Sequence, residues 1–228
     1  MDEKGFAIGV TTRSKRIVTK SIWASKQHED VLPPAIIFSG KAGLRSGWIN
    51  DAILQQHEVF LSNSVTGWTN NELGIAWLEQ VFDRSTKAKA RRQWRLLILD
   101  GHGSHVTSDF INYCDNNKIL LAIFPPHATH SLQPLDVVLF GPLGANYSRE
   151  LDRYLQRSQA LIGVKKGDFL PIFWPAWSST MRPDVIKQSF RATGIWPMEA
   201  EVILKRFNNN TSEQDKALQI SEHRDGDS

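Results

Sequence analysis

Cysteine is almost absent from this chain of 228 residues, in which Cys114 is the single example. The chain therefore cannot form an internal disulfide, which excludes the disulfide-stapled class of small secreted domains. Long apolar runs are missing as well, since no stretch approaches the roughly 20 apolar residues that cross a bilayer. The first residues, MDEKGFAIGV, also lack the cationic segment and apolar run of a secretion signal. A soluble protein of a reducing compartment is the expectation.

Acidic residues are outnumbered by cations outside the end of the chain. Residues 208–228 hold five acids against two cations, a net charge of −3. Because the whole chain carries +3, residues 1–207 carry +6. Within this basic part, the segment 87–95 (KAKARRQWR) places five cations around a tryptophan. Such a segment is typical of a nucleic-acid contact, with a solvated basic loop or a nuclear-import signal as the alternatives. The candidate phosphate contacts are Lys87, Lys89, Arg91 and Arg92.

Short apolar runs in the first part of the chain predict strands. Residues 5–10 (GFAIGV) and 15–20 (KRIVTK) flank a polar TTRS and predict a hairpin. A third strand is expected at the run AIIF, which follows two prolines and leads to Gly40. Residues 58–63 (EVFLSN) alternate weakly in polarity and predict a fourth strand.

A helix is predicted after these strands, because Thr69 and Glu72 stand at the spacing of a capping box. The threonine hydroxyl can accept a hydrogen bond from the backbone N–H three residues further on, while the glutamate reaches back. Apolar residues then recur on one helical face. They are Leu73, Ala76, Trp77 and Val81.

The segment 95–100 (RLLILD) is apolar up to its final carboxylate, a pattern typical of a central strand covered on both faces. A helix is expected from Thr107 to about Asn117, and KILLAIFPP predicts a second buried strand after it. A strand, helix and strand of these lengths form a βαβ unit with parallel strands. The fold class is therefore α/β.

This arrangement puts Asp100 at the C-terminal end of a strand, the sheet edge at which ligands gather in α/β proteins. Asp136 follows the next strand, where Pro134 is a good first helical residue and the carboxylate falls in the first turn. Two carboxylates at one edge repel each other unless a cation lies between them, so the pair predicts an oxygen-ligand site of the Mg²⁺ type, with Asp2 as the third acid. Taken singly, Asp100 could only open a turn before Gly101, and Asp136 only begin a helix.

The chain resembles the DDE superfamily endonuclease domain of pogo, Tigger and jerky-type transposases, fungal members especially. Centromere protein B carries the same domain. The resemblance extends to about Phe207, and its two central motifs, LDGHGSH and SLQPLD, have 35 residues between their aspartates. It implies a ribonuclease H-like fold, a mixed sheet flanked by helices. The stretches that carry it are DEKGF, LLILDGHGSH, FPPHATHSLQPLDVVLFGPLGANYSRE and SFRATGIWP.

The resemblance assigns Asp2, Asp100 and Asp136 to the family's first, second and third acid. It implies DNA phosphodiester cleavage and strand transfer with two Mg²⁺ or Mn²⁺ ions, one activating a water or a DNA 3′-hydroxyl and the other stabilising the leaving oxygen. Asp100 would bridge both ions. DNA is the implied partner and the nucleus the implied location, while homo-oligomerisation is left open.

Four histidines support a rival hypothesis. His102 with His105, and His127 with His130, form two HxxH pairs that could meet at the same sheet edge and bind zinc, as in a zinc hydrolase. Neither pair has the cysteine or glutamate partners usual at such sites. The resemblance instead puts all four in loops around the carboxylates, where they orient the acids or contact phosphate.

The expected organisation is a catalytic core over residues 1–163, a small helical C-terminal appendix over 164–207 and a disordered acidic tail over 208–228. The family's helix-turn-helix region and the strand that carries its first acid are missing before Asp2, which predicts an N-terminally truncated core. Misplacing an acid by about 1 Å costs a hundredfold in rate. The alternative hypothesis is therefore a catalytically inactive, domesticated or truncated relative that binds DNA or protein partners.

Overall fold

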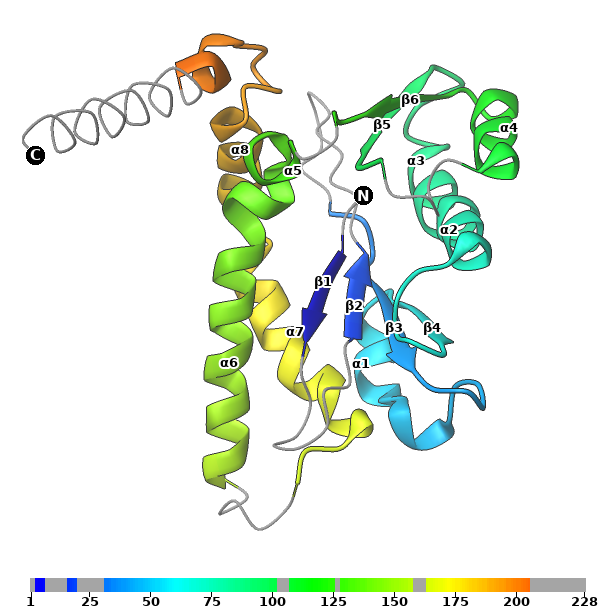
Figure 1. Ribbon diagram of the computed structural model, residues 1–228. Helices are drawn as coiled ribbons and strands as arrows, with labels where there is room; N and C mark the ends of the chain where they lie inside the picture. The colour runs from blue at the N-terminus through cyan, green and yellow to red at the C-terminus, as the bar shows by residue number, and fades with distance from the viewer. Residues whose placement is uncertain are drawn as a thin grey trace, which may run out of the picture.

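The computed structural model describes residues 3–6, 16–19, 31–101, 107–125, 128–157 and 163–205 (Figure 1). The strands in these ranges form one sheet of four and one of two, and helices cover and connect them. The strands are β1 (Glu3–Phe6), β2 (Arg16–Thr19), β3 (Ala35–Ser39), β4 (Phe60–Ser64), β5 (Arg95–Leu99) and β6 (Ile119–Ile123). The α-helices are α1 (Asp51–Gln56), α2 (Asn71–Trp77), α3 (Arg84–Thr86), α4 (Ser108–Asn116), α5 (Thr129–Leu132), α6 (Phe140–Arg157), α7 (Phe169–Thr180) and α8 (Pro183–Ala192). The 3₁₀ and π segments are η1 (Ser46–Trp48), η2 (Leu78–Asp83), η4 (Leu135–Leu139) and η5 (Lys166–Asp168).

The four-stranded sheet has the order β1-β2-β3-β4. β1 and β2 pair antiparallel, with Phe6 opposite Arg16, which confirms the pairing of the predicted hairpin strands. The paired residues of β1 begin at Glu3, earlier than predicted, and the expected turn falls outside the described residues. β3 and β4 pair parallel, with α1 in the connection between them. The mixed α/β class is thus confirmed.

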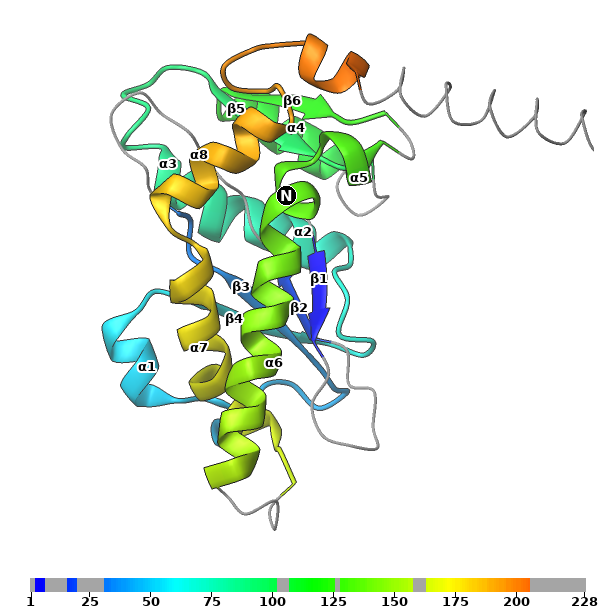
Figure 2. The same cartoon turned by 90° about the vertical axis from the view of Figure 1, so that its left-hand side faces the viewer.

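β3 is buried on both faces. Ile36 and Phe38 lie in an apolar core with α6 and α7, whereas Ala35 belongs to a second core with α2, η2, β5 and α4. In the first core, Phe6 packs against Tyr147 at 4.7 Å between ring centroids and against Phe173 at 5.8 Å. Both views show α6 and α7 side by side along one side of the molecule (Figures 1 and 2).

The two-stranded sheet confirms the predicted βαβ unit. β5 and β6 are parallel with Arg95 opposite Ile119, and α4 connects them. The expectation that residues 95–99 form a central strand covered on both faces is wrong. Leu96 is 47% exposed and Leu120 58%, because α2 and α4 cover only the inner face of this sheet. Within the described residues no ladder joins β5 to the four-stranded sheet.

The N-cap of the helix after β4 lies one residue later than the predicted cap, Thr69. Asn70 is the N-cap, and its side-chain oxygen accepts a hydrogen bond from the backbone N–H of Leu73 at 2.8 Å. The hydroxyl of Thr69 is buried and has no hydrogen-bond partner within the described residues. α2 continues through η2 into α3, and Trp77 and Val81 of the predicted apolar face are buried.

A buried ion pair joins η2 to β5. The Arg95 guanidinium lies 2.6 Å from Asp83, and the two side chains are 2% and 7% exposed. Arg95 also donates to the Thr86 hydroxyl at 3.0 Å and to the backbone carbonyl of Asn117. Burial alone would raise the pKa of the Asp83 carboxyl, but Arg95 and Lys87 outweigh it and hold that pKa below its ordinary value. Both terminal nitrogens of the Arg95 guanidinium are thus bonded inside the protein.

We predict that Gly167→Ala destabilises the fold, because a Cβ at this position would lie 2.3 Å from the backbone oxygen of Gly47. Relieving such a contact requires η1 and η5 to separate, at a cost of about 1–3 kcal/mol in the free energy of unfolding. Urea denaturation measures the change. The matched control is Gly141→Ala in α6, where a Cβ meets no atom within 4 Å and alanine should stabilise the helix by up to about 1 kcal/mol. Equal effects of the two substitutions would contradict the packing of η1 on η5.

We predict that Asp83→Asn lowers the free energy of unfolding by about 3–5 kcal/mol at neutral pH, because Arg95 would stay buried without a carboxylate. The depressed pKa of Asp83 adds stability that is present above the ordinary carboxyl value of about 4 and is lost as the pH falls through the lower folded value. The difference between wild type and variant should therefore be constant above about pH 5 and shrink in acid. Denaturant unfolding across pH checks this, and a difference independent of pH would contradict it.

Candidate active site

Asp100 directly follows Leu99 at the C-terminal end of β5 and is half-buried. Asp136 lies in the first turn of η4, directly after Pro134 and Leu135, as its sequence position predicted. Leu135 and Leu139 are buried and anchor η4, whereas the Asp136 side chain is exposed. Asp2, the third predicted acid, lies outside the described residues.

The chain path brings the two segments that carry these acids to one side of the molecule. The backbone N–H of Phe124 donates to the carbonyl of Leu99 at 3.0 Å, so that the chain leaves β6 beside the end of β5. It then forms α5, which leads into η4. In both views α5 lies between the end of β6 and the start of α6, above β1 (Figures 1 and 2).

Gln133, between α5 and η4, is a buried polar side chain whose amide is unpaired within the part of the chain that the structure describes. It is 2% exposed, and neither its amide nitrogen nor its amide oxygen has a hydrogen-bond partner within the described residues. Leaving such a group unpaired costs about 1–3 kcal/mol. Gln133 belongs to the motif SLQPLD, but the sequence alone does not predict that its side chain is buried. Unsatisfied groups of this kind concentrate at functional sites.

The predicted histidine ligands are mostly outside the part of the chain that the structure describes. His130 is exposed in α5, whereas His102, His105 and His127 are not among the described residues. Within the described ranges, no group of three or more His, Cys, Asp or Glu side chains is placed to hold a metal ion. Both the zinc and the three-acid arrangements therefore stay predictions.

The predicted phosphate contacts lie at the other end of β5 from Asp100. Lys87 is exposed but pairs with Asp83 at 3.2 Å, and Lys89, Arg91 and Arg92 are exposed in the segment before the strand. β5 has five residues, which span about 17 Å at roughly 3.3 Å per residue. Arg91 and Arg92 are therefore separated from Asp100 by the length of the strand.

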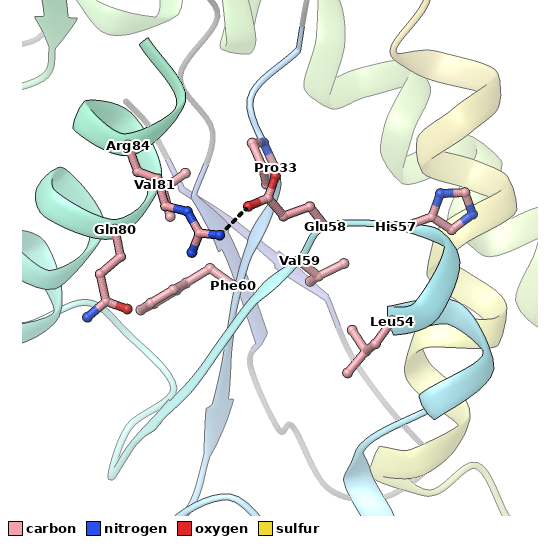
Figure 3. Close-up of a pocket in the computed structure, with 9 residues that line it drawn as sticks. All are labelled: Pro33, Leu54, His57, Glu58, Val59, Phe60, Gln80, Val81 and Arg84. Carbon is pink, nitrogen blue, oxygen red and sulfur yellow. Dashed lines mark ion pairs between the residues drawn. The ribbon is translucent and has the colours of Figure 1, made fainter. Parts of the chain in front are cut away.

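Two hollows of about 270 and 640 Å³ open where β3 and β4 begin. Both are lined by Pro33, His57, Glu58 and Arg84, and the ion pair between Arg84 and Glu58, at 3.6 Å, spans the space between their elements (Figure 3). The His57 ring stacks on Trp174 with 4.1 Å between centroids. Neither Asp100 nor Asp136 lines these hollows, so they are separate from the candidate active site.

Comparison with known proteins identifies the class. A family model described as DDE superfamily endonuclease matches residues 15–190, and the chain therefore belongs to this family. Its relatives include the pogo transposable element with KRAB domain of Mus musculus, 32% identical over 132 residues (55% of this chain and 21% of that protein). The Homo sapiens protein of the same name is 29% identical over 154 residues (60% and 25%). The chain is thus a pogo-type DDE domain.

A further relative is the MFS-type transporter clz9 of Cochliobolus lunatus, 35% identical over 177 residues. These residues are 78% of this chain but 19% of that protein, and the chain spans a quarter or less of each of the three relatives. Among the described helices, none has the length and apolar character needed to cross a membrane. No solved structure matches the chain.

We predict that Gln133→Met raises the free energy of unfolding by about 1 kcal/mol, because methionine has a similar shape and carries no amide to leave unpaired. Urea denaturation measures the change, with Gln80→Met at an exposed position of η2 as the matched control, for which little change is expected. A loss of stability in Gln133→Met alone would show that the amide is bonded within the fold.

Proposed function

We propose that this domain cleaves DNA phosphodiester bonds and transfers strands with two divalent ions held by Asp2, Asp100 and Asp136. The observation that carries the proposal is the placement of Asp100 and Asp136 in a chain of the DDE endonuclease family. Asp100 directly follows the last residue of β5, and Asp136 lies in the first turn of η4. β1 begins one residue after Asp2.

The residues present suit a hard divalent cation. Carboxylate oxygens are the ligands that Mg²⁺ and Mn²⁺ prefer. Asp136 is exposed and can be reached by a ligand from solvent. The amide of Gln133, three residues earlier, has no hydrogen-bond partner among the described residues and can both donate to and accept from a polar group. The described part of the chain supplies two of the three acids, so the fit of the third rests on the family motif.

Each side chain has a defined part in this proposal. Asp100 is attached to the end of a strand whose inner face is packed in the second core, which limits its movement. Asp136 is held by the buried Leu135 and Leu139 on either side of it. Divalent ions bound there would neutralise the phosphate and activate the attacking water or 3′-hydroxyl. DNA is then the partner, and the nucleus is the expected location.

A second candidate function is binding of DNA without cleavage. It is favoured by the absence, within the described residues, of a ladder between β5 and the sheet that contains β1. In the absence of such a ladder, backbone hydrogen bonds do not fix the distance between Asp100 and the residue that precedes β1. An error of about 1 Å in this distance would cost a hundredfold in rate.

We predict that the protein nicks duplex DNA with Mg²⁺ or Mn²⁺ and that Asp100→Asn and Asp136→Asn each lower the rate by at least about a hundredfold. Supercoiled plasmid relaxation measures the rate. Asp152→Asn, an exposed acid of α6, is the matched control and should leave it unchanged. A folded wild-type protein that binds DNA but never nicks it would refute the enzyme and favour the second candidate.

A further inference from the structure

Two turns at the N-terminal ends of β5 and β6 form a basic and aromatic surface, which we name the Trp94 patch. It consists of Arg91, Arg92, Trp94 and Lys118. Arg91 and Arg92 lie in the turn before β5, and Lys118 directly precedes β6. Because Arg95 is paired with Ile119, Trp94 and Lys118 come side by side one residue before the ladder. All four residues are exposed, Trp94 to 61%.

The patch contains unusual backbone conformations. Among the described residues, three that are not glycine have φ in the left-handed region, and all three are cations of this patch: Arg91 at 45°, Arg92 at 70° and Lys118 at 57°. This conformation costs about 1–2 kcal/mol for an ordinary residue and almost nothing for glycine. Strain of this kind is typical of functional surfaces.

The two turns support each other. The Lys118 ammonium donates to the backbone carbonyl of Arg92 at 3.2 Å, and the backbone N–H of Arg95 donates to the carbonyl of Lys118 at 3.0 Å. The neighbouring Arg95 is fixed in its buried pair with Asp83, which sets the start of the strand. The strained turns are therefore attached to a rigid element.

The two arginine side chains are available to a ligand. Neither guanidinium makes a hydrogen bond or an ion pair with any residue in the described ranges, in contrast to Lys87 and Arg95 of the same segment. Asp115 is the acid of the adjoining turn, and its backbone carbonyl accepts a hydrogen bond from the backbone N–H of Lys118. Arginines beside an exposed indole match the phosphates and bases of a nucleic-acid strand.

We infer that the Trp94 patch is a second DNA contact, which holds the backbone through Arg91, Arg92 and Lys118 and stacks an unpaired base on Trp94. The inference rests on the proposed function for its choice of DNA as ligand. The patch and Asp100 lie at opposite ends of β5, about 17 Å apart at roughly 3.3 Å per residue. At about 3.4 Å per base pair, that distance corresponds to about five base pairs.

Fluorescence anisotropy in EDTA tests the patch without any cleavage. The probes are a labelled blunt duplex and the same duplex with a single-stranded overhang. The double variant Arg91→Gly/Arg92→Gly should weaken binding of both probes. It should also reduce the slope of log affinity against log salt concentration by the amount expected for about two phosphate contacts. Trp94→Ala should weaken binding of the overhang probe about 5- to 100-fold and leave the blunt duplex unchanged. The glycine variant should melt no lower than wild type, since glycine relieves the left-handed strain.

The control variant is Lys41→Ala/Arg157→Ala, which removes two exposed cations distant in sequence from the patch and should leave both affinities unchanged. Unchanged DNA binding by the double glycine variant would overturn the inference. Competition by an acidic peptide as effective as that by the overhang oligonucleotide would also overturn it, in favour of a protein partner. Loss of nicking with intact patch binding would refute the proposed cleavage alone.

Discussion

The buried ion pair of Asp83 and Arg95 determines which side chains of β5 face the core and which face solvent. Because strand side chains alternate between faces, fixing Arg95 inward also turns Leu97 and Leu99 inward and leaves Trp94 and Leu96 outside. The same pair attaches the start of β5 to η2 and, through the carbonyl of Asn117, to the end of α4. The position of Asp100 at the far end of the strand follows from this attachment.

The sequence predicted those features that depend on local patterns. The βαβ unit around β5 and β6, the pairing of β1 with β2 and the helical turn at Asp136 were all evident from periodicity and turn chemistry. It could not predict which of the five cations in residues 87–95 is buried. Arg95 is buried because Asp83, Thr86 and the carbonyl of Asn117 surround its guanidinium after folding, whereas Lys87 pairs with Asp83 from the exposed side.

Two predictions from the sequence were wrong, namely the helix cap at Thr69 and the covering of residues 95–99 on both faces. Both depend on how the segment packs against other elements, which its own sequence does not specify. Thr69 and Asn70 are both good caps, and only the path of the chain from β4 decides that Asn70 accepts the bond. The apolar runs of β3 and β5 look alike in sequence. β3 lies between two cores, whereas β5 is covered on one face only, so Leu96 remains exposed.

Asp100 and the Trp94 patch lie at opposite ends of β5, which imposes a geometric constraint on any DNA that engages both. β5 is rigid on its inner face, so the interval between Asp100 and Arg92 cannot adapt to the ligand by sliding of the strand. DNA is itself stiff over a few base pairs. Under the proposed function, simultaneous contact would fix which phosphate reaches Asp100, and the cleavage position would be set by distance from the Trp94 patch rather than by base contacts at the acids.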